Sequence, residues 1–355
     1  MVEISIAPSP IRSTQSLRRK FFPTPLSGLA SILAIALMCW IAWIVLRWAL
    51  WNAVFSGTPA DCSNAKGACW AVITARWRLM FFGLYPYEQH WRSAIGCLTL
   101  ITVIVLSCIP FFWTAPRIAV LWISSLIVFV VVMYGGIFGL PVVPEDKWGG
   151  LTLSIFIFAG AALIGMPLAI ALALLRRSPY GLVARCAGLL IDVVRSVPLV
   201  TILFAVVIVL PIVAPDLAGT KVTRVIVGMG IFFSAYQAEI IRSGIQSLPA
   251  GQDEAAKALG LNYWHRTRKV ILPQAFRRAL PPTVSQFAIS FKEVALVIIV
   301  GIFDFLASGN AAYGSGEWAF AYVEVYVFMA FVYFIFVFSL SRHGAFLERR
   351  MRVGK

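Results

Sequence analysis

The sequence predicts an all-α fold, a polytopic transmembrane helical bundle with about eight spans. Of its 355 residues, 60% are hydrophobic and only 13% are charged, whereas soluble domains carry about 45–50% apolar and about 25% charged residues. Successive apolar runs reach the roughly 20 residues that a helix needs to cross a bilayer. Runs such as 123–133 and 328–338 show no alternation of polar and apolar residues, which argues against transmembrane strands and leaves helices.

A window of about 19 residues locates the spans along the chain. The first span is too long for a signal peptide and no small-residue cleavage site follows it, so we expect it to stay in the membrane. The expected spans cover roughly residues 27–46, 93–113, 118–137, 151–175, 188–213, 222–241, 284–306 and 318–340.

The basic segments between the spans predict the orientation of the chain. The net charge is +15, and its Lys and Arg residues lie between apolar runs, which indicates contact with membrane lipid headgroups and not with nucleic acid. Alternation of the spans puts the main basic segments on one side, so the positive-inside rule makes both termini cytoplasmic. These segments are the N-terminal tail with Arg12, Arg18, Arg19 and Lys20, the link 176–185, the link 242–278 and the tail from Arg342.

The segment between the first two spans does not fit this scheme. It is basic, although alternation places it outside, so it is either an exception to the positive-inside rule or partly interfacial. In the second interpretation residues 70–85, which mix aromatic and basic side chains, lie flat on the membrane as an amphipathic helix. The basic residues concerned are Arg47, Lys66, Arg76, Arg78 and Arg92.

A Pro-rich, charged connector at 141–146 predicts a domain boundary. Residues 1–145 are interpreted as an N-terminal extension with about three transmembrane helices and an external loop. Residues 146–345 form the main transmembrane domain, and residues 346–355 form a basic cytoplasmic tail.

The remaining motifs mainly exclude functions. Cys62 and Cys69 flank a polar stretch that the topology places outside, where a disulfide can form, and the bonded and reduced states both stay open. No G-x-x-x-x-G-K-[ST] loop occurs, so the chain should not bind ATP, and its 3 histidines are too far apart for a metal motif. No catalytic set can be assembled from the sequence, so we do not expect an enzyme.

The most informative segment is the cytoplasmic link 249–273, PAGQDEAAKALGLNYWHRTRKVILP. Asp253 suits the first turn of a helix and lies on the same face as Lys257. Gly260 can adopt the left-handed conformation that ends this helix, and Asn262 can cap the next one. A third helix is expected to open at Pro273.

The first of these helices has features of a docking element. Ala255 and Ala256 leave one face almost bare, so it can press into a groove of a partner, while Glu254 can add a charged hydrogen bond. An ordinary surface helix is the alternative.

The spacing of this link resembles the signature of the binding-protein-dependent ABC importer permeases, with Val270 in place of the usual isoleucine. The resemblance implies a five-helix core of the type I importer permeases at the C-terminal end and a loop that couples to a separate ATPase dimer, which binds the ATP. It also implies a second, non-identical permease, a periplasmic amino-acid-binding protein, no cofactor in this chain, and the bacterial inner membrane. The residues that match are Glu254, Ala255, Ala256, Gly260, Val270, Leu272 and Pro273.

Other segments are similar to the polar amino acid permeases within that family. Residues 195–199, 235–245 and 291–296 match its characteristic segments, although Val294 and Ala295 replace two hydroxyl side chains and put any substrate contact there in doubt. The long N-terminal extension resembles the broad-specificity L-amino-acid branch. The resemblance implies amino acids as cargo.

Ionisable groups inside spans are the candidates for the transport pathway, because each costs roughly 2.5–3.5 kcal/mol at a helix centre. Lys292 and Glu293 could receive both charges of a zwitterionic amino acid, or could be satisfied by each other or by the second permease. Asp192 could pair with Arg195, and Glu239 is expected to pair with Arg242. The candidate pathway residues are Gln286, Lys292, Glu293, Asp304 and Arg195.

Two other classes of protein compete with this interpretation. An ion-gradient-driven secondary transporter of small polar solutes would show inverted repeats and broken helices in both halves. A membrane scaffold would need no polar groups within its spans.

Overall fold

The structure, a computed structural model, describes residues 24–217, 219–314 and 316–352. Arg12, Arg18, Arg19 and Lys20 of the basic N-terminal tail lie outside these residues. Within the described ranges every regular element is a helix, and extended pairing is limited to two isolated bridges, which confirms the all-α prediction. The chain forms two compact units, Met1–Ala71 and Val72–Lys355, which are described separately.

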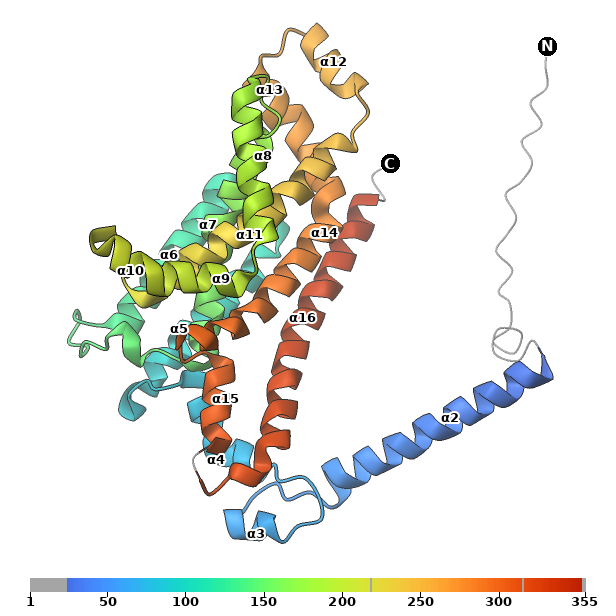
Figure 1. Ribbon diagram of the computed structural model, residues 1–355, viewed down its shortest axis with the longest axis vertical. Helices are drawn as coiled ribbons and strands as arrows, with labels where there is room; N and C mark the ends of the chain where they lie inside the picture. Colours follow the sequence, from blue (N-terminus) through green and yellow to red (C-terminus); the bar gives the residue numbers. More distant parts are fainter. Residues whose placement is uncertain (1–23, 218, 315, 353–355) are drawn as a thin grey trace. The chain divides into compact units, whose positions relative to one another are not determined.

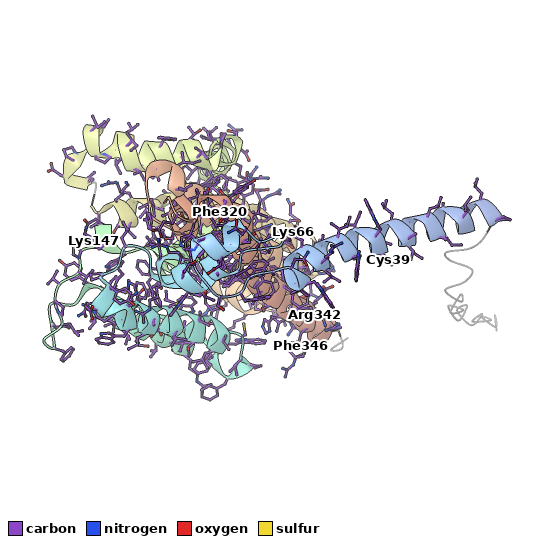
Figure 2. The ribbon with its side chains drawn as sticks, turned by 90° about the horizontal axis from the view of Figure 1, so that it is seen from below. Cys39, Lys66, Lys147, Phe320, Arg342 and Phe346 are labelled. Atoms are coloured by element: carbon purple, nitrogen blue, oxygen red, sulfur yellow. A yellow bond between two sulfur atoms is a disulfide. The ribbon has the colours of Figure 1, made fainter. Side chains whose placement is uncertain are left out.

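The first unit contains the first expected span. The helix α2 (Pro25–Leu46) begins at Thr24, whose side chain accepts a hydrogen bond from the Ser27 N–H. With the wide turn that follows, it runs to Trp51 and is long and apolar enough to cross a membrane. Side chains project from it in all directions, Cys39 among them (Figure 2), and only Gly28 is buried. A helix that is apolar all round and exposed in this way is suited to lipid.

The loop after α2 is tied together by local bonds. The short helix α3 (Pro59–Ser63) contains Cys62, which forms a disulfide with Cys69, with the Cα atoms 5.5 Å apart. The Trp70 ring N–H donates to the Ala49 carbonyl at 2.7 Å. Backbone and hydroxyl hydrogen bonds from Thr58 hold the pKa of the exposed Asp61 below its usual value.

The second unit contains the remaining helices. In Figure 1 the helices α12 and α13 lie at one end of this unit and α15 lies at the opposite end. Over the whole described chain, seven helices can cross a membrane, or eight if one bent pair counts as a span, which agrees with the expected number. The helices are α4 (Ala71–Phe82), α5 (His90–Ser107), α6 (Ala115–Tyr134), α7 (Gly150–Leu175), α8 (Gly181–Ser196), α9 (Leu199–Phe204), α10 (Leu210–Val213), α11 (Lys221–Gln246), α12 (Gly251–Ala258), α13 (Tyr263–Arg266), α14 (Leu272–Glu293), α15 (Phe305–Gly314) and α16 (Tyr322–Arg352).

The expected span 188–213 is not one straight helix. The chain bends by 102° between α8 and the segment Leu199–Val213, so α9 and α10 run across the direction of α8 (Figure 1). The cause is Pro198, because a residue before proline avoids the helical region, and Val197 has an extended ψ of 134°. The predicted span is therefore present as a bent pair of helices and not as one straight helix.

The expected span 284–306 also has different bounds. A continuous helical segment runs from Tyr263 to Val300 and ends at Gly301, which is left-handed with a φ of 75°. The separate short helix α15 follows it, so Asp304 lies in the turn before α15 and not in a span. At the end of the chain, α16 continues to Arg352 and includes most of the expected tail; Arg342 and Phe346 lie on its last part (Figure 2).

The helices α4 to α6 pack against the later helices of the same unit. Met80 and Tyr85, in or just after α4, are buried within the protein, so one face of this helix packs into the fold, while Trp77 is exposed. Ser93 of α5 lies 3.1 Å from Thr152 of α7 through their hydroxyl groups. By its contacts, the part of the extension after Ala71 belongs to the main bundle.

Two basic residues of the nominally external segment are engaged inside the fold. Arg92 is fully buried and donates to the backbone carbonyls of Val132, Met133 and Pro141. Arg78 stacks on the ring of Tyr87, 4.5 Å from its centre. Such side chains stabilise the fold, which is a physical reason for their departure from the positive-inside rule.

Candidate functional site

The cytoplasmic link forms the helix and turn that the sequence predicts. Asp253 and Lys257 pair at 3.4 Å on one face of α12. Gly260 is left-handed, with a φ of 73°, and ends the turn after α12. The side chain of Asn262 accepts a hydrogen bond from the His265 N–H at 2.9 Å and caps α13. The structure thus confirms the helix, the turn and the cap that local sequence rules predict for the first half of this link.

The second half of the link is one continuous helix. Pro273 occupies the first turn of α14 as expected, but no break separates α14 from α13. A wide turn at Thr267–Ile271 joins them, and the Leu272 N–H donates to the Thr267 carbonyl across it. A third, separate helix opening at Pro273 is therefore not formed.

The exposed face of α12 differs from the expected one. Glu254 and Ala255 are exposed, but Ala256 is only 3% exposed and packs into the protein itself. Leu259 and Trp264, which the sequence reasoning overlooked, are 80% and 71% exposed. Large apolar side chains beside the turn glycine of a basic link are the signal that would have identified them.

Four polar side chains form a stripe on one face of α14, where Thr283, Gln286, Ser290 and Glu293 are spaced by three or four residues. Gln237 of α11 donates to the Thr283 hydroxyl at 2.8 Å. Gln286 donates to the Ser290 hydroxyl at 3.3 Å. These contacts are buried within the bundle.

The far end of the α14 stripe borders a small apolar hollow. Ser290 and Glu293 line it together with Phe158 and Phe232, and its volume is about 10 Å³. Such a space holds at most about one water. An amino acid could enter only after the helices move.

Lys292 does not share the stripe. Among the described residues it makes no ion pair with Glu293, since consecutive helical residues point in different directions. Its side chain is exposed on the surface of the single chain. The alternative in which Lys292 and Glu293 neutralise each other is not seen.

Arg195 has a different partner from the one expected. Asp192 pairs with Arg176 at 3.1 Å, and not with Arg195. Arg195 lies 3.9 Å from Glu239, which also pairs with Arg242 at 2.8 Å, as predicted. The Asp192–Arg195 pair is wrong because Arg176 approaches from α7, a long-range contact that spacing within one helix cannot reveal.

Asp304 is fully buried and caps a helix. Its Oδ1 accepts a hydrogen bond from the Ala307 N–H at 2.9 Å, in the first turn of α15. Within the described ranges, no three His, Cys, Asp or Glu side chains gather as a metal site.

A larger hollow lies at the start of α11. Its volume is about 400 Å³, and its lining includes Glu145, Asp146 and Lys221. Lys221 donates to the Gly301 carbonyl at 3.0 Å, and Glu145 accepts from the Thr220 hydroxyl at 2.6 Å. Charges of both signs therefore line one hollow near the start of α15.

These features define a membrane transport subunit, a polytopic helical bundle with a polar stripe inside it and a short helix projecting at one end. Residues 165–353 match the family described as binding-protein-dependent transport system inner membrane component. The chain belongs to this family.

Relatives and a solved structure resemble the chain beyond this region. An inner membrane amino-acid ABC transporter permease protein of Escherichia coli K12, YhdY, is 39% identical over 96% of this chain and 93% of its own. A glutamate/glutamine/aspartate/asparagine transport system permease protein of Rhodobacter capsulatus, BztC, is 30% identical over 97% of this chain and 95% of its own. A crystal structure of an amino acid ABC transporter with histidines matches with a TM-score of 0.51 and 30% identity, over 57% of this chain and 92% of that one.

Family membership decides between the classes of protein considered above. The chain is a multi-pass inner-membrane permease subunit of an ATP-driven ABC importer, works with ATPase subunits, and is not an enzyme. The ion-gradient-driven transporter and the scaffold are not supported. The match also confirms the resemblance drawn from Glu254, Gly260 and Pro273.

Proposed function

We propose that the chain imports amino acids and is driven through α12, which docks into a groove of an ATPase dimer. The observation that carries the proposal is the exposure of Glu254, Ala255 and Leu259 on a short helix closed by a left-handed glycine. An exposed carboxylate and apolar side chains together suit a protein partner. Gly260, Leu272 and Pro273 have a structural role, because they set the direction in which α12 extends from the bundle.

The transport pathway is proposed to follow the polar stripe on α14. The Gln286 amide can donate to the carboxylate of a passing amino acid, and the Glu293 carboxylate can accept from its ammonium group. Lys292 points out of the single chain, so it would face a second, non-identical permease. This arrangement would avoid the roughly 2.5–3.5 kcal/mol that a charge costs at the lipid-facing centre of a helix. Asp304 and Arg195 lie outside the stripe and contribute indirectly.

We propose that a periplasmic amino-acid-binding protein delivers the cargo near the 400 Å³ hollow at Lys221. Both termini would be cytoplasmic, since α12 and the basic residues of 263–278 share one side under the positive-inside rule. We keep three functional regions in this proposal. They are an extension at 1–145, a transport domain at 146–345 and a basic tail at 346–355. The start of α7 at Gly150 supports its main boundary.

Co-purification with the ATPase tests the docking proposal. Glu254→Ala combined with Leu259→Ala should release the ATPase from the permease pair, while Tyr180→Ala, on another exposed turn, should not. Retention of the ATPase and normal uptake in the double variant would contradict the proposal.

The pathway proposal has its own test. Glu293→Gln and Gln286→Ala should lower uptake about tenfold or more with the ATPase still bound, because a single charged hydrogen bond is worth about 1.5–3 kcal/mol. Ile289→Ala, on the exposed side of α14, is the matched control. Normal uptake in both variants would exclude the stripe as the pathway.

A further inference from the structure

Four charged side chains meet around Glu239 of α11, and they come from α11 itself, from α8 and from the end of α7. Its Oε1 accepts hydrogen bonds from Arg176 of α7 at 2.7 Å and from Arg242 of α11 at 3.0 Å. Its Oε2 accepts from Arg242 at 2.8 Å and lies 3.9 Å from Arg195 of α8. Arg176 in turn donates to both oxygens of Asp192 on α8, at 3.1 and 3.3 Å. These five residues are called the Glu239 cluster below.

The centre of the Glu239 cluster is shielded from water, whereas its two α8 members are more accessible, with the Asp192 side chain 57% and the Arg195 side chain 37% exposed. The Glu239 side chain is 15% exposed and the Arg176 side chain is 24% exposed. Ion pairs in such positions are screened less than pairs on an open surface. Loss of the central carboxylate would also leave three guanidinium groups facing one another. The link between α7 and α11 through Arg176 and Glu239 is therefore stronger than a surface salt bridge.

The same helices are joined to the cytoplasmic link by apolar packing. Residues of α7, α8 and α11 share one buried apolar cluster with Ile271 and Ala275, which lie just after α13. Gly244 of α11 approaches α14 so closely that a Cβ there would lie 2.7 Å from the Ala275 carbonyl. The two helices that flank α12, α11 and α14, are thus in close contact at Gly244.

By contrast, α8 has little apolar attachment of its own. Only Ala187, Gly188 and Ile191 are buried along it. Its polar attachments run through Asp192 and Arg195 of the Glu239 cluster, and the Arg195 carbonyl also accepts a hydrogen bond from the Tyr236 hydroxyl of α11 at 3.3 Å. The Glu239 cluster therefore supplies the ionic part of the attachment of α8, just before the bend at Pro198.

We propose that Glu239 is a positioning residue that makes α8 move together with the cytoplasmic link when the ATPase acts on α12. This inference rests on the proposed docking of α12. Without the cluster, the ATPase would still bind and hydrolyse ATP, but α8 would not follow. ATP hydrolysis and transport would then become uncoupled.

The test uses the complete complex in proteoliposomes, with Glu239→Gln, which keeps the size of the side chain and removes its charge. We expect the ATPase to co-purify, ATP hydrolysis to stay above about half of the unmodified rate, and uptake to fall about tenfold or more. Arg224→Gln, at the other end of α11, is the matched control and should change neither rate. A parallel fall of hydrolysis and uptake, or no change in either, would overturn the inference.

A distance measurement separates movement from activity. Spin labels at Leu189→Cys on α8 and Ala258→Cys on α12, with Cys39 and Cys186 changed to Ser, report on the two elements. Their separation should stay constant between the ATP-bound and nucleotide-free states in the parent chain and should change in Glu239→Gln. A separation that stays constant in both chains would overturn the inference.

A milder variant tests the same inference in case Glu239→Gln prevents assembly of the complex. Arg176→Gln removes the α7 link but leaves Glu239 paired with Arg242, so folding should survive. Uptake should fall about fivefold with hydrolysis retained, and equal loss of both would count against the inference. Failure of the docking proposal would be recognised separately, because the ATPase would then still co-purify with the Glu254→Ala, Leu259→Ala double variant.

Discussion

Arg92 of α5 donates from its Nε to the carbonyl of Val132, 40 residues later, at 2.7 Å. The last carbonyls of a helix have no partner within the helix, and Arg92 supplies donors to those of α6. The same guanidinium reaches the Pro141 carbonyl at 2.8 Å, in the connector to α7. A buried cation thus fastens the extension to the connector that leads into the transport domain.

Removal of these donors should destabilise the whole second unit. Arg92→Met keeps most of the side-chain length but leaves buried carbonyls unpaired, which we expect to cost about 2–4 kcal/mol. The measurement is the thermal unfolding midpoint of the purified complex in detergent. Arg78→Gln, which loses only ring stacking, should have a much smaller effect. Equal midpoints for Arg92→Met and the parent chain would show that the cap has no role in stability.

The elements that depend on local chemistry could be predicted from the sequence. The turn at Gly260 and the cap at Asn262 need only neighbouring backbone, and the spans need only apolar length. The contacts that escaped prediction are long-range or depend on packing. Arg176 displaces Arg195 as the partner of Asp192, and Ala256 is buried although its neighbours Glu254 and Ala255 are exposed.

Gly260 should tolerate few replacements. Its φ of 73° is costly for a residue with a Cβ atom, by roughly 1–2 kcal/mol, and most costly for a β-branched one. Gly260→Val should therefore reorient α12 and reduce the fraction of permease that retains the ATPase, whereas Gly260→Asn should be tolerated better. A pull-down with tagged ATPase measures this fraction. Equal retention by the two variants would contradict the role given to this turn.

Leu259 and Trp264 should contribute binding free energy to the ATPase. Full burial of such a side chain is worth about 1.5–3 kcal/mol, which corresponds to a ten- to hundredfold change in the dissociation constant. Leu259→Ala and Trp264→Ala should each weaken the complex by this factor in a titration with purified ATPase. Leu182→Ala, on exposed α8, is the control. Unchanged affinity in both variants would place the ATPase contact elsewhere.

The disulfide at Cys62 and Cys69 makes a prediction about topology. If the loop faces the periplasm, both thiols should resist labelling until a reductant is added, because that compartment is oxidising. Mass spectrometry of the alkylated protein measures this directly. Cys39, exposed on α2, should label without reduction in detergent. Free thiols at Cys62 and Cys69 in protein purified without reductant would contradict the external placement of the loop.

The measurement that most directly tests the central claim is amino acid uptake into proteoliposomes holding the two permeases, the ATPase and an external binding protein. We expect radiolabelled amino acid to accumulate only when ATP is enclosed and the binding protein is present, with no requirement for a proton or sodium gradient. Glu254→Ala combined with Leu259→Ala should abolish this uptake. Accumulation without ATP, driven by an imposed ion gradient, would contradict the account.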